Sequence, residues 1–127
     1  MKKILLISLF ASLVLVTACS ESNANGENDQ DYQKFAQCMT EKGAKMYGTF
    51  ACSACNYQKQ MFGDAASELN YIECSPQGEN SQAEFCIEKN IQAYPTWEFE
   101  DGSRLVGAQP LETLAEKVGC GVLVSSQ

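Results

Sequence analysis

Residues 44–63, AKMYGTFACSACNYQKQMFG, decide the fold of this chain. The apolar run from Ala44 to Phe50 predicts a β-strand, and the segment that starts at about Cys52 predicts an α-helix. The helix is expected to bury a stripe of residues that recur at every fourth position: Tyr57, Met61, Ala65 and Leu69. A C-x-x-C motif that directly follows a strand and opens a helix is a more specific signal than the same motif elsewhere.

The two cysteines of this motif, Cys52 and Cys55, suit thiol chemistry. The first lies at the start of a helix, where free backbone N–H groups and the helix dipole stabilise a thiolate. The thiolate is the species that attacks a disulfide. The second cysteine lies one turn further along, where it can close a disulfide ring with the first. We therefore expect Cys52 to be the attacking thiol and Cys55 the resolving thiol.

Local patterns on either side of the motif predict the remaining elements. A helix with Phe35, Cys38 and Met39 on one face precedes the first strand, and Gly43 ends it. The later segments predict strand 69–74, helix 82–90, strands 96–100 and 103–107 around Asp101-Gly102, and a helix from Pro110 to Gly119. The order α-β-α-β-α-β-β-α predicts an α/β fold with a mixed four-stranded sheet and helices on both faces.

Residues 1–18 predict a bacterial signal peptide. Lys2 and Lys3 precede an apolar run, which is shorter than the about 20 residues that a membrane span needs. The run ends in Val-Thr-Ala-Cys, which is typical of a lipobox, in which Cys19 would become the first mature residue and carry the lipid. Ordinary signal cleavage nearby and an uncleaved anchor are the alternatives.

Two segments are expected to follow the signal peptide. Residues 19–31, CSESNANGENDQD, are polar and acidic and predict a flexible tether. Residues 32–127 are expected to form one domain. The protein is thus expected to be exported and held by its lipid at the periplasmic or extracellular face of a bacterial membrane.

The composition excludes several classes of site. The net charge is −7, and loss of Lys2 and Lys3 with the signal peptide would make it −9, so the surface does not suit nucleic acid. The chain has no histidine, which excludes histidine-activated nucleophiles and removes the commonest metal ligand. The acidic residues are expected to lie on the solvated surface without a catalytic role. Trp97, Phe99 and Tyr47 are expected in the core.

The chain resembles the thioredoxin-like domain associated with bacterial vitamin K epoxide reductase homologues. The resemblance extends from about Phe35 to Cys120. It is carried by three segments: MYGTFACSACNYQKQMFG (46–63), YIECSPQGENSQAEFC (71–86) and IQAYPTWEFEDGSRLVGAQPLETLA (91–115). It implies a thioredoxin-like fold, a disulfide oxidoreductase activity and a membrane redox partner that passes electrons to quinone.

The resemblance also implies roles for two further segments. In thioredoxin-like folds a cis-proline lies beside the reactive cysteines and offers backbone groups to substrate, so Tyr94, Pro95 and Thr96 are expected to bind substrate. The family places a cysteine pair in the segment that contains Cys74 and Cys86, which implies a structural disulfide. Two buried free thiols, or a redox relay with the C-x-x-C pair, are the alternatives.

The sequence departs from the family at the site itself. The family usually has Trp before the first cysteine and Pro-His between the two, whereas this chain has Ala51, Ser53 and Ala54. The missing histidine removes a group that stabilises the thiolate of Cys52. Thioredoxin carries a buried acid where this chain has Met46, so proton transfer to or from Cys55 must use water or another group.

Two cysteines of the domain remain after these pairs. A bridge between Cys38 and Cys120 would complete the set, provided that their Cα atoms lie within about 7 Å of one another. The sequence leaves this pairing open.

The leading hypothesis is a thiol-disulfide oxidoreductase that acts on protein thiols and disulfides through Cys52 and Cys55. It predicts neither a cofactor nor a metal site. A copper(I)-handling module that uses soft thiolates is one alternative. A binding domain in which the C-x-x-C pair forms a permanent structural disulfide is another.

Overall fold

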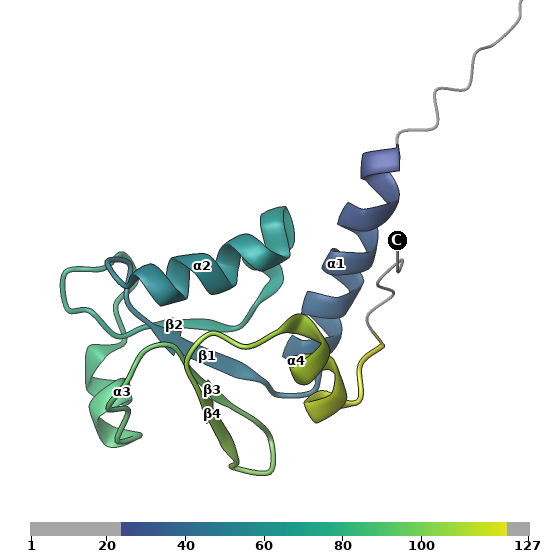
Figure 1. The fold of residues 1–127 in the computed structure, drawn as a ribbon. Helices are drawn as coiled ribbons and strands as arrows, with labels where there is room; N and C mark the ends of the chain where they lie inside the picture. The colour runs from purple at the N-terminus through teal and green to yellow at the C-terminus, as the bar shows by residue number, and fades with distance from the viewer. Residues whose placement is uncertain (1–23, 122–127) are drawn as a thin grey trace, which may run out of the picture.

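The computed structural model describes residues 24–121, which form a four-stranded sheet with helices on both faces (Figure 1). The elements in chain order are α1 (Ala24–Glu41), β1 (Lys45–Gly48), α2 (Ser53–Phe62), the 3-10 helix η1 (Gly63–Glu68), β2 (Tyr71–Glu73), α3 (Ala83–Glu88), β3 (Thr96–Glu98), β4 (Arg104–Val106) and α4 (Leu111–Val118). The predicted α/β class and mixed four-stranded sheet are confirmed, and the architecture is compatible with a thioredoxin-like fold.

The sheet has the strand order β2-β1-β3-β4. Strands β1 and β2 are parallel, with Gly48 opposite Glu73, whereas β3 is antiparallel to both β1 and β4. The carboxyl ends of β1 and β2 therefore lie side by side, and the C-x-x-C motif begins shortly after the end of β1. Residues at these strand ends are therefore the ones that lie closest to the two cysteines.

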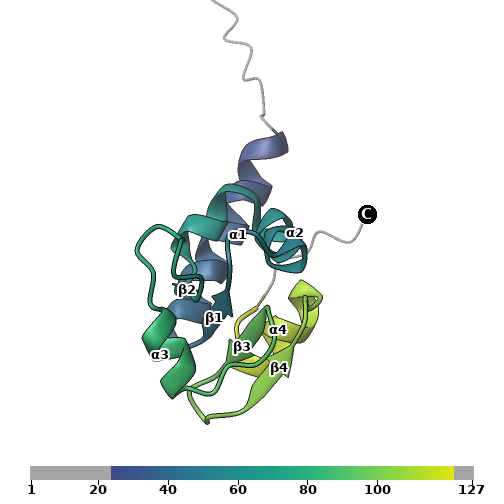
Figure 2. The same ribbon diagram turned by 90° about the vertical axis from the view of Figure 1, so that its left-hand side faces the viewer.

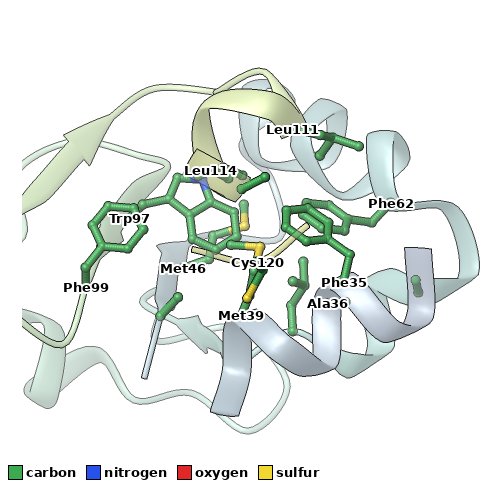
Figure 3. Close-up of a cluster of buried hydrophobic side chains, with 14 of the residues drawn as sticks. Phe35, Ala36, Met39, Met46, Phe62, Trp97, Phe99, Leu111, Leu114 and Cys120 are labelled. Carbon is green, nitrogen blue, oxygen red and sulfur yellow. The ribbon is translucent and has the colours of Figure 1, made fainter. Parts of the chain in front are cut away.

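Two apolar clusters cover the two faces of the sheet. The larger cluster combines α1, α2 and α4 with Met46 and Trp97 from the central strands (Figure 3). The smaller cluster contains Tyr47 and Ile72 from the opposite face and lies against α3, which stands apart from the other helices (Figure 2). Because side chains alternate along a strand, Met46 and Tyr47 point to opposite faces. Trp97, Tyr47 and Phe99 are buried, as predicted.

The helix that carries the cysteines differs from its predicted form. Tyr57 is 59% exposed, and the buried face of α2 is instead formed by Cys55, Gln58 and Phe62. Gly63, with φ +57°, ends the α-helix before the predicted stripe can continue. The four-residue spacing was therefore wrong for Tyr57, whereas Ala65 and Leu69 are buried as expected, beyond the end of α2.

That glutamine fixes α2 to the rest of the core. The Trp97 Nε1–H donates to Gln58 Oε1 at 3.1 Å, and the backbone N–H of Gln109 donates to the same oxygen at 2.6 Å. The Gln58 Nε2 donates in turn to the Gln109 carbonyl at 3.1 Å. A buried amide is tolerated when it is hydrogen-bonded in this way. The helix is thereby fixed one turn after Cys55.

The N-terminal region differs from the expectation of a tether up to Asp31. Helix α1 begins at Ala24, so the described part of that segment is helical, and this end of α1 projects beyond the other helices (Figure 1). The predicted signal peptide, Cys19 and the first part of the tether lie outside the described residues. Between residues 24 and 121, no helix is long and apolar enough to cross a membrane.

Candidate active site

Cys52 and Cys55 lie where strand β1 passes into helix α2. Cys52 is the N-cap of α2, with the extended backbone angles φ −79° and ψ 115°. The backbone N–H of Cys55 donates to Cys52 Sγ at 3.2 Å, so the sulfur takes the place of a capping oxygen. The two cysteines are not bonded to each other, and Cys52 is partly exposed. Cys52 is therefore the sulfur that a partner can reach.

Cys55 lies beneath the first turn of α2 and is 0% exposed. Burial raises the pKa of its thiol to about 12, and its hydrogen bond with Cys52 acts in the same direction. The thiol therefore keeps its proton near neutral pH unless a neighbouring group removes it. A neighbouring group that accepts this proton would therefore speed any reaction of Cys55 near neutral pH.

Gly48, the last residue of β1, brings Cys55 and Tyr71 together. A Cβ atom at this position would lie 2.9 Å from Cys55 Sγ and 3.0 Å from Tyr71 Cε2. The first distance is shorter than real Cβ contacts and the second is tight, so any side chain here would push Cys55 or Tyr71 aside. The buried thiol and the tyrosine ring thus flank the same backbone position, with no side chain between them.

Next to this contact, Tyr71, Glu73 and Lys59 form a cluster of polar side chains. The Tyr71 hydroxyl donates to Glu73 Oε2 at 3.0 Å, and the backbone N–H of Ser75 donates to Glu73 Oε1 at 2.8 Å. The ammonium nitrogen of Lys59 lies 3.3 Å from the centroid of the Tyr71 ring, a cation–π contact. The glutamate is 6% exposed.

Burial and charge alter the acidity of this cluster. Burial raises the pKa of Tyr71, and its hydrogen bond to the Glu73 carboxylate raises it further. Burial lowers the pKa of Lys59, against the opposing effect of Glu73 and Cys55. The groups around Cys55 therefore influence each other's protonation, as groups at reactive sites often do.

The sequence interpretation missed this cluster. The acidic residues were expected on the surface, but Glu73 and Glu98 are both buried, which corrects that expectation. Each is accommodated because it accepts hydrogen bonds. One signal was present in the sequence: Tyr-x-Glu on a strand places both side chains on the same face.

The second buried pair of this kind lies on the opposite face of the sheet. The Tyr47 hydroxyl donates to Glu98 Oε1 at 3.2 Å, and Arg104 Nη2 donates to Glu98 Oε2 at 2.6 Å. Lys89 Nζ lies 3.8 Å from the same carboxylate. Burial alone would raise the pKa of Glu98, but Arg104 and Lys89 hold it below its usual value. Burial beside Glu98 raises the pKa of Tyr47 to about 12.

The predicted substrate-binding segment differs in exposure along its length. The Tyr94–Pro95 peptide bond is cis, and Tyr94 is 38% exposed. Pro95 and Thr96 are buried. The Pro95 carbonyl accepts the N–H of Gly107 at 2.8 Å, and the Thr96 hydroxyl donates to the Ala93 carbonyl at 2.8 Å. Tyr94 is thus the member of the segment whose side chain reaches solvent.

The other four cysteines of the described region form two disulfides. Cys74 is joined to Cys86 with a Cα–Cα distance of 5.7 Å, next to the smaller apolar cluster. Cys38 is joined to Cys120 with a Cα–Cα distance of 6.1 Å, within the reach that the sequence left open. The structure therefore leaves Cys52 and Cys55 as the free thiols among the residues it describes.

Comparison with known proteins supports a redox domain. No model of a protein family matches the chain. The chain is 44% identical over 88 residues to the thiol-disulfide oxidoreductase LTO1 of Arabidopsis thaliana, a match that covers 66% of this chain and 23% of the relative. The chain thus spans about a quarter of that protein's length. Together with the fold, this similarity supports a domain that resembles those of thiol-disulfide oxidoreductases.

Proposed function

We propose that the protein exchanges disulfides with protein partners through Cys52 and Cys55. One observation carries the proposal: a partly exposed, unbonded Cys52 caps helix α2, with its sulfur 3.2 Å from the N–H of a buried, unbonded Cys55. A sulfur at the N-terminus of a helix is favoured as a thiolate by the free N–H groups and the helix dipole. The similarity to a thiol-disulfide oxidoreductase supports the same reaction class.

The exchange proceeds in two displacements. The Cys52 thiolate attacks one sulfur of a partner disulfide, forms a mixed disulfide and releases the other sulfur as a thiolate, which takes a proton from water. The Cys55 thiol then loses its proton and attacks Cys52 Sγ, which releases the second partner sulfur. The partner is reduced to two thiols, and Cys52 and Cys55 are oxidised to a disulfide. The reverse sequence donates a disulfide to a reduced partner.

The proposed setting is the periplasmic or extracellular face of a bacterial membrane, where a lipid anchor would hold the protein. The apolar run that ends in Val-Thr-Ala-Cys19 supports a lipid anchor, and the resemblance noted above supports a partner of the vitamin K epoxide reductase type. Such a partner would move electrons between Cys52-Cys55 and membrane quinone. Replacement of Cys19 by Ala should abolish lipid labelling and release the protein from membranes. A native protein that is soluble and unmodified would contradict the anchor.

The reaction is tested by trapping in the native host. Cys55→Ser cannot resolve a mixed disulfide, so partners should stay attached to Cys52 and be released by a reductant. Cys52→Ser is the matched control and should trap nothing. A reduction potential below about −300 mV for Cys52–Cys55 would instead favour a structural disulfide.

A further inference from the structure

We infer that Tyr71 and Glu73 accept the proton of Cys55 when that thiol attacks the mixed disulfide, a role that rests on the exchange reaction proposed above. Tyr71 is the group that meets Cys55, and Glu73 is the final acceptor behind it. The inference supplies the group that the sequence lacked, because position 46 holds a methionine instead of a buried acid.

The geometry brings the thiol, the phenol and the carboxylate close to one another. Cys55 Sγ and the Tyr71 ring both lie against the position of the absent Gly48 side chain, and the Tyr71 hydroxyl would lie 3.3 Å from the same Cβ. The hydroxyl is bonded to Glu73 Oε2 at 3.0 Å. A hydroxyl can accept one proton while it donates its own, so it can pass a proton without a net change.

The glutamate is enclosed, which separates it from ordinary surface acids. A side chain at Gly78 would overlap Glu73, so the loop after β2 packs directly on the carboxylate. The carboxylate also accepts the N–H of Ser75, which fixes its orientation.

Glu73 forms no salt bridge with any residue that the structure describes. The charged and titratable groups that face Cys55 are Cys52 and Lys59 from α2 and Tyr71 and Glu73 from β2. Trp97 of β3, which shares the core cluster with Cys55, adds no titratable group. Lys59 lies over the Tyr71 ring and so favours negative charge on either the phenol or the thiol.

The proposed step balances. The Cys55 proton moves to the Tyr71 oxygen while the Tyr71 proton moves to Glu73. The electron pair left on Cys55 Sγ forms the bond to Cys52 Sγ. The bond between Cys52 and the partner sulfur breaks, and its electron pair leaves with the partner as a thiolate, which takes a proton from water. In the reverse direction Glu73 returns the proton through Tyr71.

The experiment separates the two displacements in one reaction. The protein is reduced at Cys52 and Cys55 only and mixed with dithiobis(nitrobenzoate), and the released coloured thiol is followed by stopped flow. The attack by Cys52 gives a first phase, and the attack by Cys55 on the mixed disulfide gives a second. Glu73→Gln and Tyr71→Phe should each slow the second phase by about a hundredfold or more, the lower end of general base catalysis. The first phase should keep its rate.

The pH profile distinguishes proton transfer from a structural effect. With the acceptor in place, the second phase should vary weakly between about pH 6 and pH 9, whereas in Glu73→Gln it should rise steeply, because Cys55 must then ionise to solvent. The matched control is Tyr47→Phe, which removes the equivalent hydroxyl from the other pair and should leave both phases unchanged. Tyr71→Phe is nearly isosteric and tests the path even if Glu73→Gln does not fold.

Each outcome has a distinct meaning. A normal second phase with a normal pH profile in folded Tyr71→Phe and Glu73→Gln would overturn the proton path but leave the exchange reaction intact. If Tyr47→Phe slowed the second phase as much as Tyr71→Phe does, the slowing would be a general effect on packing. That result would also overturn the proton path. Absence of a first or second phase in the unaltered protein would count against the proposed exchange itself.

Discussion

The two faces of the sheet carry the same components in different arrangements. Each has a tyrosine that donates to a buried glutamate: Tyr71 to Glu73 on the α2 face and Tyr47 to Glu98 on the α3 face. Each also has a pair of cysteines nearby. On the α3 face the cysteines are bridged and the glutamate is paired with Arg104 and Lys89. On the α2 face the cysteines are free and the glutamate has no salt bridge to a described residue.

The difference shows what makes a buried carboxylate structural or reactive. Glu98 is neutralised by two fixed cations, so its charge is part of the packing and changes only at low pH. Glu73 is held by a hydroxyl and a backbone N–H, and its neighbour Lys59 contacts the Tyr71 ring instead. The same residue type therefore serves stability at Glu98, and under the proposed path it accepts a proton at Glu73.

Removal of the bridge on the α3 face should give the largest loss of stability. The double variant Cys74→Ala/Cys86→Ala should lower the free energy of unfolding by about 2–5 kcal/mol, as is typical for a native disulfide in a small domain. Cys52→Ser should change it little, because Cys52 has no disulfide to lose and a serine oxygen can take over the helix cap. Urea unfolding of both variants checks this, and equal midpoints would contradict a structural role for the bridge.

Removal of the cation that pairs with Glu98 should have the next largest effect. Arg104→Met leaves a buried carboxylate with Lys89 alone, at an expected cost of about 2–3 kcal/mol, less than for a fully buried pair because Arg104 is 32% exposed. Lys59→Met should cost less, since Lys59 pairs with no carboxylate. Thermal unfolding of the two variants compares their losses of stability. A larger loss in Lys59→Met than in Arg104→Met would contradict the prediction.

A side chain at Gly48 should disturb only the α2 face of the sheet, where Cys55 and Tyr71 lie. Gly48→Ala places a methyl group against Cys55 and Tyr71, which should destabilise the domain by about 1–3 kcal/mol and slow the attack by Cys55. Gly121→Ala, where nothing lies within 4 Å, is the control and should do neither. Full second-phase activity in Gly48→Ala would show that Cys55 and Tyr71 need no close approach.

The pH dependence of the free energy of unfolding should depend on Glu98 of the α3 face. This effect should be smaller than those of the substitutions above. Because the pKa of Glu98 is lowered in the folded protein, its stabilising effect is complete above its unfolded pKa of about 4.3 and is lost as the pH falls through the folded value. Glu98→Gln should therefore flatten the fall in stability below about pH 5. Urea midpoints across that range are the measurement, and parallel curves for the two proteins would contradict it.

Local signals were sufficient to predict the order of elements. Pro110 and Gly119 bound the last helix as expected, and Asp101-Gly102 lies in the turn between β3 and β4. These signals work because each depends on the backbone preferences of one or two residues. The position of Cys52 and Cys55 between a strand and a helix was predicted in the same way.

The partners of buried polar groups could not be predicted, because they come from distant segments. Gln58 is buried because Trp97 and Gln109 satisfy its amide, and Glu98 because Arg104 and Lys89 surround it. A single sequence shows the polar residue but not the group that will meet it. The buried face of α2 and the Tyr71–Glu73 pair were missed for this reason.

The bridge between Cys38 and Cys120 closes a covalent ring around almost the whole domain, with a sequence separation of 82 residues. Cys52, Cys55, the other disulfide and the four strands lie inside this ring. Tension applied between the first turns of α1, before Cys38, and Gly121, after Cys120, would therefore be carried by the bridge and would not pull on the sheet. A protease cut within the ring would likewise leave the two pieces joined until the bridge was reduced.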